Sequence, residues 1–120
     1  MTQTITPINV MQQGAENFPW VSQWVDNLVL AANTAKSYNV TAARAAMGLP
    51  AGTALFVSLS ADAAYWANLT GGTAAVPSGD IANGTGSEYQ PNQRYIDESI
   101  TSISFISTPG AHVSLAFYRP

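Results

Sequence analysis

The sequence has few charged residues, and this limits the partners that the protein can bind. Lys, Arg, Asp and Glu make up 9% of its 120 residues, against about 25% in a typical soluble domain. Four Lys and Arg residues and a net charge of −3 do not supply the basic surface that nucleic-acid binding needs. The apolar share of 47% is too high for a charge-rich disordered chain. We therefore expect one folded domain that binds no nucleic acid.

Cysteine is absent and histidine occurs once. The lack of cysteine excludes a disulfide framework, a thiolate metal site and a cysteine nucleophile. One histidine, His112, does not make a usual zinc site, and no Gly-x-Ser-x-Gly motif supplies the nucleophile of a Ser-His-Asp triad. The acidic residues are scattered, with no pair that stands out as the two carboxylates of a glycosidase. We expect a protein that is not an enzyme, with no catalytic residue, metal ligand or cofactor.

Long apolar runs are also missing. Ala45–Ala61 and Ser99–Tyr118 lack Asp, Glu, Lys and Arg. The first contains Gly48 and Pro50, and the second is interrupted at Pro109-Gly110, so neither predicts a transmembrane helix. The N-terminus also lacks the basic and apolar regions of a signal peptide. We expect no membrane partner and no secretion.

Period-two alternation of apolar residues predicts strands at the C-terminal end. Ile100–Ser107 and His112–Tyr118 both alternate. Thr108–Ala111 between them predicts a type II turn, because Pro109 presets φ and Gly110 supplies a positive φ. We expect these two strands to form a hairpin. The residues expected to point inward are Ile103, Phe105, Val113, Leu115 and Phe117.

Further strands are expected upstream. Ala54–Ser60 predicts a strand with Leu55, Val57 and Leu59 on one side. Asp62–Asn68 is either its continuation or its antiparallel partner. Asn27–Val40 favours a strand, a turn at Ala32–Thr34 and a second strand.

The remaining segments predict one short helix and two irregular regions. Thr41–Met47 predicts a helix capped by Thr41 and ended by Gly48. Gly71–Arg94 is irregular apart from Thr73–Val76, and a loop of this length in a compact domain usually has a function or meets a partner. We expect residues 1–25 to form an N-terminal arm and residues 26–120 to form a β-sandwich domain.

The loop Asp80–Glu88 has one chemical alternative to an ordinary turn. It gathers Asp, Asn, Thr, Ser and Glu oxygens around two glycines, and calcium prefers such hard ligands. The spacing is not that of an EF-hand, whose oxygen ligands alternate before the glycine. A turn in which Asp and Asn bond their own backbone explains the same residues.

The aromatic residues suit either an interface or a sugar-binding platform, because Trp and Tyr combine an apolar body with a polar group. Trp66 is expected in the core. Phe18-Pro19-Trp20 is expected to dock on a neighbouring subunit or partner. The residues that we expect at an interface, from the arm and the loop, are Ile8, Val10, Phe18, Trp20, Trp24 and Tyr89.

The second half of the sequence shows a succession of turns and strands. It runs through Gly71–Asp80, Asn83–Glu88, Pro91–Ile96, Ile103–Phe105 and Val113–Tyr118. This pattern resembles the small minor structural proteins of tailed bacteriophages that decorate, or cement, the capsid. With the preceding strands, the resemblance covers Leu28 to Tyr118.

The strand pattern predicts an all-β fold with an extended N-terminal arm and one short helix, and the arm lies outside the resemblance. The resemblance implies that this fold is a compact antiparallel β-sandwich, with the jelly roll among its forms. It implies a structural virion protein on the capsid surface, made in the bacterial host cytoplasm. The implied partners are the phage major capsid protein and further copies of the chain, with a trimer favoured. Two other functions stay open: a tail, baseplate or head-fibre β-module that binds host-surface glycan, and a calcium-stabilised β-module.

Overall fold

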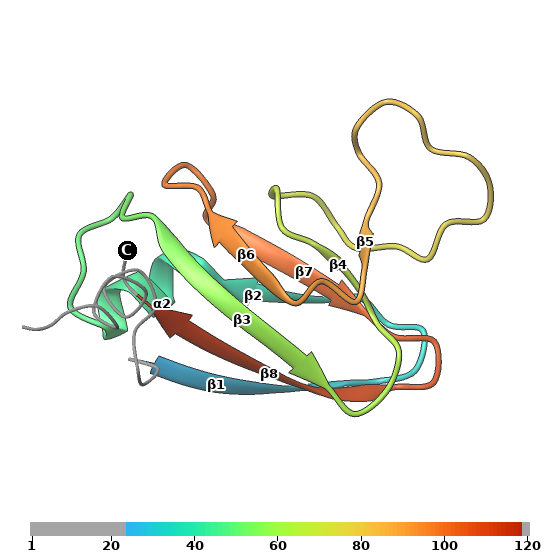
Figure 1. Ribbon diagram of the computed structural model, residues 1–120, viewed down its shortest axis with the longest axis horizontal. Coiled ribbons are helices and arrows are strands. Elements are labelled where there is room, and N and C mark those ends of the chain that lie inside the picture. The colour runs from blue at the N-terminus through green and yellow to red at the C-terminus, as the bar shows by residue number, and fades with distance from the viewer. Residues whose placement is uncertain (1–23, 119–120) are drawn as a thin grey trace, which may run out of the picture.

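A computed structural model describes residues 24–118, which form two four-stranded sheets packed against each other (Figure 1). The strand orders are β1-β8-β3-β6 in the first sheet and β2-β7-β4-β5 in the second. All strand pairs named in these orders are antiparallel, so the all-β antiparallel sandwich is confirmed. The elements are β1 (Trp24–Leu30), β2 (Lys36–Asn39), α2 (Val40–Ala46), β3 (Leu55–Ala61), β4 (Trp66–Asn68), β5 (Glu88–Tyr89), β6 (Gln93–Ile96), β7 (Ser102–Ile106) and β8 (Ala111–Tyr118).

The strand pairing follows one rule along the chain. β1 pairs with β8, β2 with β7, β3 with β6 and β4 with β5. The first four strands therefore pair with the last four in reverse order, as in one long hairpin bent at the β4–β5 connection. The additional pairs β3–β8 and β4–β7 roll this hairpin into two sheets. This topology is a jelly roll.

The core lies between the two sheets and is built from alternate residues of the strands. Tyr38 on β2 stacks on Phe117 on β8, with ring centroids 5.6 Å apart, and so joins the two sheets. Each large apolar side chain buried here contributes about 1.5–3 kcal/mol. The inward positions expected from the alternation are confirmed as buried: Leu55, Val57, Leu59, Ile103, Phe105, Val113, Leu115 and Phe117.

The expected C-terminal hairpin is wrong, because β7 and β8 belong to different sheets. The chain turns between them one residue earlier than expected, with the Gly110 amide donating to the Ser107 carbonyl at 3.4 Å, and Gly110 has the expected positive φ, +86°. A Cβ on Gly110 would lie 3.1 Å from the Leu30 carbonyl oxygen, so the turn passes close to the end of β1. Alternation identifies the inward side of a strand but does not identify the strand beside it.

The expectation for Asp62–Asn68 is wrong for the same reason. β4 neither continues β3 nor pairs with it, and lies in the second sheet between β5 and β7. Tyr65 is the buried aromatic of this segment, and its hydroxyl donates to the Pro91 carbonyl at 2.5 Å. Trp66 is only partly buried and its ring lies 4.9 Å from that of the exposed Tyr89, so the prediction that it belongs to the core is wrong.

The short helix forms near the expected place but with a different cap. α2 begins at Val40, and the side-chain oxygen of Asn39 accepts a hydrogen bond from the Ala42 amide at 2.9 Å. Asn39, not Thr41, is therefore the N-cap residue. Gly48 has a φ of +77° just after the helix, as expected of the residue that ends it.

The long connection between β4 and β5 is irregular, as expected, but Thr73–Val76 does not form a strand. The Ala74 amide donates to the Ser104 hydroxyl at 2.9 Å, and the Ala75 amide donates to the Ser87 hydroxyl at 3.1 Å. These amides bond to side chains, so no neighbouring strand is needed. The rest of the connection, residues 75–86, is exposed and projects from the sandwich (Figure 1). We call residues 75–86 the projecting loop.

The expected boundary between arm and domain is also corrected. Trp24 and Val25 form the start of β1 and pair with Phe117 and Ala116 on β8. These two residues belong to the sandwich, although the sequence assigns them to the arm. Four of the expected interface residues lie outside the described residues: Ile8, Val10, Phe18 and Trp20.

Candidate functional site

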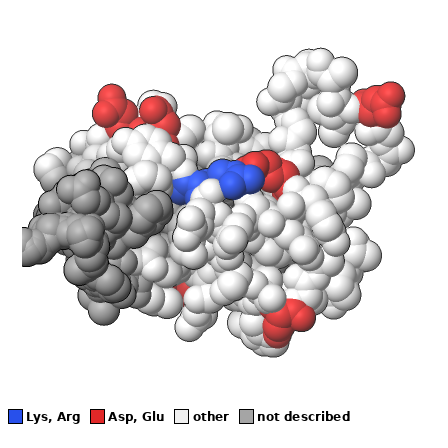
Figure 2. All heavy atoms as spheres, viewed as in Figure 1, with Lys and Arg blue, Asp and Glu red and all other residues white. Residues whose placement is uncertain are grey.

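The outward side of the first sheet forms a broad surface without charged side chains. Side chains alternate across a strand, so the neighbours of the buried residues point outward. None of these outward residues is Asp, Glu, Lys or Arg, and Figure 2 shows few coloured atoms over β3 and β8. We call this surface the outer sheet face. It consists of Val25, Asn27, Val29, Phe56, Ser58, Ser60, Gln93, Tyr95, His112, Ser114, Ala116 and Tyr118.

One end of the outer sheet face is aromatic. Phe56 lies between Tyr95 and Tyr118 in the strand register. The rings of Phe56 and Tyr95 meet edge to face, with centroids 5.0 Å apart. Edge-to-face aromatic pairs add about 0.5–1.5 kcal/mol beyond the area that they bury. Tyr95, Phe56 and Tyr118 therefore form an aromatic row along this end of the outer sheet face.

The middle of the outer sheet face is made of small side chains. Ala116 lies opposite Ser58 on one side and Val25 on the other. Ser114 lies opposite Ser60 and Asn27 in the next outward row. Short side chains let another backbone approach closely, and uncharged ones cost little to desolvate. The arrangement therefore suits contact with another protein surface.

The face also exposes large apolar residues. Val25, Val29, Phe56 and Tyr95 are each at least 40% exposed, and they are four of the seven large apolar residues exposed among residues 24–118. Single exposed apolar residues are ordinary, whereas a group on one face marks an interaction surface. The concentration on one sheet therefore points to a binding function.

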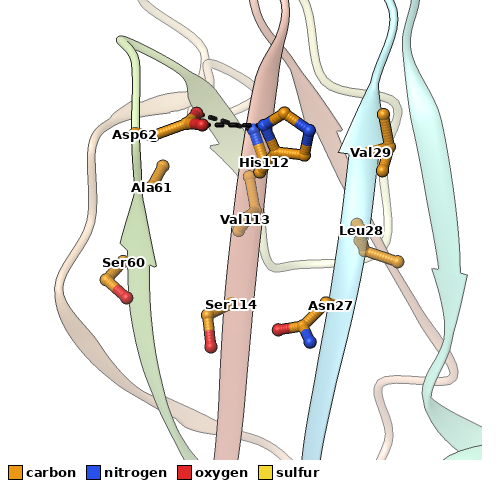
Figure 3. Close-up of a pocket in the computed structure, with 9 residues that line it drawn as sticks. All are labelled: Asn27, Leu28, Val29, Ser60, Ala61, Asp62, His112, Val113 and Ser114. Atoms are coloured by element: carbon orange, nitrogen blue, oxygen red, sulfur yellow. Dashed lines mark hydrogen bonds and ion pairs between the residues drawn. The ribbon is translucent and has the colours of Figure 1, made fainter.

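A hollow of about 440 Å³ extends from the middle of the outer sheet face to its other end. Figure 3 shows Asn27, Ser114 and Ser60 on three neighbouring strands, with the Asp62–His112 pair beyond them. Asp62 accepts a hydrogen bond from the His112 amide at 2.7 Å, and its other oxygen lies 2.7 Å from the His112 Nδ1. The hydrogen bond from the His112 amide, and then that from the ring, lower the pKa of the Asp62 carboxyl.

The Asp62–His112 pair does not complete a catalytic triad. Among the described residues, no hydroxyl group hydrogen-bonds to His112, and Figure 3 shows Ser60 and Ser114 further along their strands. Nucleophilic catalysis needs the nucleophile within hydrogen-bond reach of its base. The pair instead fastens the end of β3 to the start of β8.

The side chains of the loop Asp80–Glu88 are not arranged as the ligands of a calcium ion. Glu88 lies in β5 and forms an ion pair with Arg94 at 2.8 Å. Asn83 accepts hydrogen bonds from the amide and the hydroxyl of Thr85, as in an ordinary turn. Between residues 24 and 118, no three His, Asp or Glu side chains gather as metal ligands.

The two expected interface residues that the structure describes lie on opposite sheets. Trp24 packs against the core from β1, and its indole N–H donates to Asp26 at 3.1 Å. Tyr89 is 55% exposed on β5, beside Trp66. Trp24 therefore closes the margin of the core, and the role of Tyr89 at an interface stays a prediction.

The residues of the outer sheet face were not among the interface residues expected from the sequence. Its signal was available in the alternation, because Phe56, Ser58 and Ser60 lie on the opposite side of the strand from the predicted inward residues. The register that places these residues beside Tyr95 and Ser114 comes from long-range pairing, which the alternation does not contain.

The fold and this surface define a jelly-roll β-sandwich with an uncharged outer sheet face. No family model, curated protein or solved structure matches the chain. In the part of the chain that the structure describes, no helix has the length and apolar character needed to cross a membrane.

Proposed function

We propose that the protein is a structural protein of a bacteriophage virion, which binds the exterior of the capsid and reinforces contacts between subunits of the major capsid protein. The observation that carries the proposal is the uncharged outer sheet face with its small central residues. Jelly rolls occur in viral capsid proteins, but a fold does not by itself define a function. The sequence resemblance supports the same class.

The chemistry of the outer sheet face favours protein as the partner. Burying a charged group costs much unless it finds a partner, and this face has no Asp, Glu, Lys or Arg to bury. The aromatic row of Phe56, Tyr95 and Tyr118 supplies anchors of the type that dominate protein interfaces. In this proposal the protein carries out no reaction and acts through contacts alone.

The projecting loop stays free in this arrangement. Ala74, the residue before it, donates to Ser104 on β7 of the second sheet, and the loop extends to one side of the sandwich beyond β4 and β5 (Figure 1). In a protein docked through the first sheet, residues 75–86 therefore lie outside the contact. The proposal includes association with further copies of the chain, for which the resemblance implies a trimer.

Co-sedimentation tests the proposal. Empty shells assembled from the major capsid protein of the phage that encodes this chain are mixed with the purified protein and pelleted. Ser114→Arg places a cation at the centre of the outer sheet face, and Ser78→Arg places one on the projecting loop as the matched control. We expect the wild type and Ser78→Arg to pellet with the shells and Ser114→Arg to bind at least about tenfold more weakly, since each 1.4 kcal/mol is tenfold.

Two results contradict the proposal. A wild-type protein that stays in the supernatant at all concentrations would remove the capsid as partner. A folded Ser114→Arg variant that pellets like the wild type would remove the outer sheet face as the binding surface. Thermal melting of the three proteins shows whether each is folded.

The hollow supports a second candidate, a tail, baseplate or head-fibre module that binds host-surface glycan. Its lining offers the amide of Asn27, the hydroxyls of Ser60 and Ser114, and the Asp62–His112 pair. A few convergent polar groups in a concave site are typical of small-molecule binding. A glycan array distinguishes the candidates: specific glycan binding that Asn27→Ala abolishes favours this one, and a silent array disfavours it.

A further inference from the structure

The four strands at the margins of the two sheets differ in length and in chemistry. β5 has two residues, β2 has four and leads directly into α2, and β6 has four and carries Arg94 paired with Glu88. Short or charged marginal strands resist pairing with another chain. β1 has seven residues, and Val25, Asn27 and Val29 on its outward side are exposed and uncharged. It is therefore the strand best suited to accept a further strand.

Backbone groups on the free side of β1 are available for pairing. Among residues 24–118, β1 lies at the margin of the first sheet and has β8 as its one neighbouring strand (Figure 1). The Lys36 ammonium donates to the Val29 carbonyl at 3.4 Å, which places that carbonyl on the free side. In an antiparallel pair, successive residues direct their backbone N–H and C=O groups alternately toward the partner strand and away from it. The groups of Asn27 and Val25 therefore point to the same free side.

We propose that β1 pairs antiparallel with β1 of a second copy of this chain, about a two-fold axis at Asn27. In this register Asn27 lies opposite the partner subunit's Asn27, and Val25 lies opposite the partner subunit's Val29. The two exposed valines are equally spaced about Asn27, so the strand is self-complementary, as a two-fold interface requires. The two first sheets then join into one continuous sheet.

The charges around β1 do not prevent pairing with a second copy. Asp26 is the one acidic residue of the strand, and it accepts hydrogen bonds from Trp24 and from the Tyr38 hydroxyl. Lys36 lies at the free side of β1 and occupies the Val29 carbonyl there. Its ammonium must leave this carbonyl before another strand can pair with β1. Lys36 is exposed, so water replaces that carbonyl at little cost.

This pairing goes beyond capsid binding and does not depend on it. It uses the margin of the first sheet, whereas the capsid proposal uses its face. A two-fold dimer is also a different assembly from the trimer that the resemblance implies, so the solution mass decides between them without any capsid present.

Sedimentation equilibrium over a range of concentrations is the first test. We expect the wild type to approach twice the mass of one chain. The double variant Val25→Lys and Val29→Lys places lysine against lysine across the axis, and we expect it to associate at least about tenfold more weakly. Val76→Lys, on an exposed valine of the projecting loop, is the matched control and should behave as the wild type. Lys36→Ala should strengthen association.

A wild-type protein that is monomeric at every concentration overturns the proposal. So does an oligomer of any size that the folded double lysine variant leaves intact. Circular dichroism of each variant confirms its fold, and Val25 and Val29 are exposed enough for lysine to be accepted there.

Introduced cysteines test the register, because the chain has none of its own. Opposed residues of paired strands lie about 5.5 Å apart between Cα atoms, within the range of a disulfide. Under mild oxidation we expect Asn27→Cys to cross-link with itself. Val25→Cys and Val29→Cys should cross-link in a mixture but not alone. Cross-linking of Val25→Cys with itself, or none in any sample, overturns the two-fold register.

Discussion

Arg44 holds together the end of the sandwich near α2. It is 1% exposed, and its guanidinium donates to the carbonyls of Thr53, Ile100 and Asp97 at 2.6, 2.7 and 3.1 Å. One planar side chain thus joins the helix to the turn before β3 and to the turn before β7. The rigid fork of donors in arginine suits such a set of acceptors, and the single ammonium of lysine does not.

Replacing Arg44 should destabilise the protein strongly. We expect Arg44→Met to lower the free energy of unfolding by roughly 3 kcal/mol, since hydrogen bonds to a charged group contribute about 1.5–3 kcal/mol each and their loss leaves carbonyls unpaired. Arg44→Lys should recover only part of this loss. Urea denaturation measures the difference, and a loss under about 1 kcal/mol for Arg44→Met would contradict the role assigned to Arg44.

The acid sensitivity of the protein should depend in part on Asp97. Hydrogen bonds from the Ser99 side chain and amide hold the pKa of the Asp97 carboxyl below its ordinary value of 3.8. A carboxyl whose pKa is lower in the folded state stabilises the fold above about pH 4 and loses this effect as pH falls through the lowered pKa. We therefore expect Asp97→Ala to lower the Tm near neutral pH, with the gap closing as the solution is acidified.

Glu98→Ala is the control for Asp97. Within residues 24–118 the Glu98 side chain donates and accepts no hydrogen bond, so we expect no change in Tm. An Asp97→Ala gap that stays the same down to about pH 2 would contradict the linkage.

Single residues of the core were predictable, and single polar contacts were not. The alternation in the C-terminal segment correctly identifies Leu115 and Phe117 as buried. From the sequence, Arg44 resembles a solvent-facing helix residue. Its burial was not predictable, because its acceptors Asp97 and Ile100 lie more than 50 residues away in the sequence. Patterns over neighbouring residues carry no information on such distant partners.

At the scale of elements, the start of the β4–β5 connection depends on one glycine. The Asn68 side-chain oxygen accepts hydrogen bonds from the amides of Thr70 and Gly72, at 3.1 Å each. A Cβ on Gly72 would lie 2.9 Å from the Asn68 Nδ2. The buried Asn68 therefore fixes the path of the chain only while residue 72 has no side chain.

Substitution at Gly72 should disturb this connection. We expect Gly72→Ala to destabilise the protein by about 1–3 kcal/mol, because the added carbon displaces a buried side chain. Gly79→Ala is the matched control, since nothing lies within 4 Å of its Cβ position. Thermal or urea unfolding compares the two, and equal stability of the two variants would contradict the assigned packing.

The sequence patterns predicted strands and their inward sides, but not which strands pair. The expected strands around Leu55–Leu59 and Val113–Phe117 exist with the expected inward sides. Their partners were wrong, because period two specifies a face and tertiary packing selects the neighbour. Thr73–Val76 has the composition of a strand, but its amides bond to the hydroxyls of Ser87 and Ser104.

At the scale of the whole molecule, the jelly roll brings together the strands that form the outer sheet face. Its four strands come from distant parts of the chain, and each contributes uncharged outward residues. The composition shows that the sequence has few charged residues. Only the fold shows that uncharged residues gather on one sheet face. The all-β class was likewise predictable, whereas the reverse-order pairing of the strands was not.

The measurement that tests the account most directly is an electron cryo-microscopy map of capsid shells decorated with the wild-type protein. We expect density for the sandwich on the shell exterior, with β1, β8, β3 and β6 against the capsid and the projecting loop outside the contact. A map with no added density, or with the second sheet or the projecting loop against the capsid, would contradict the account.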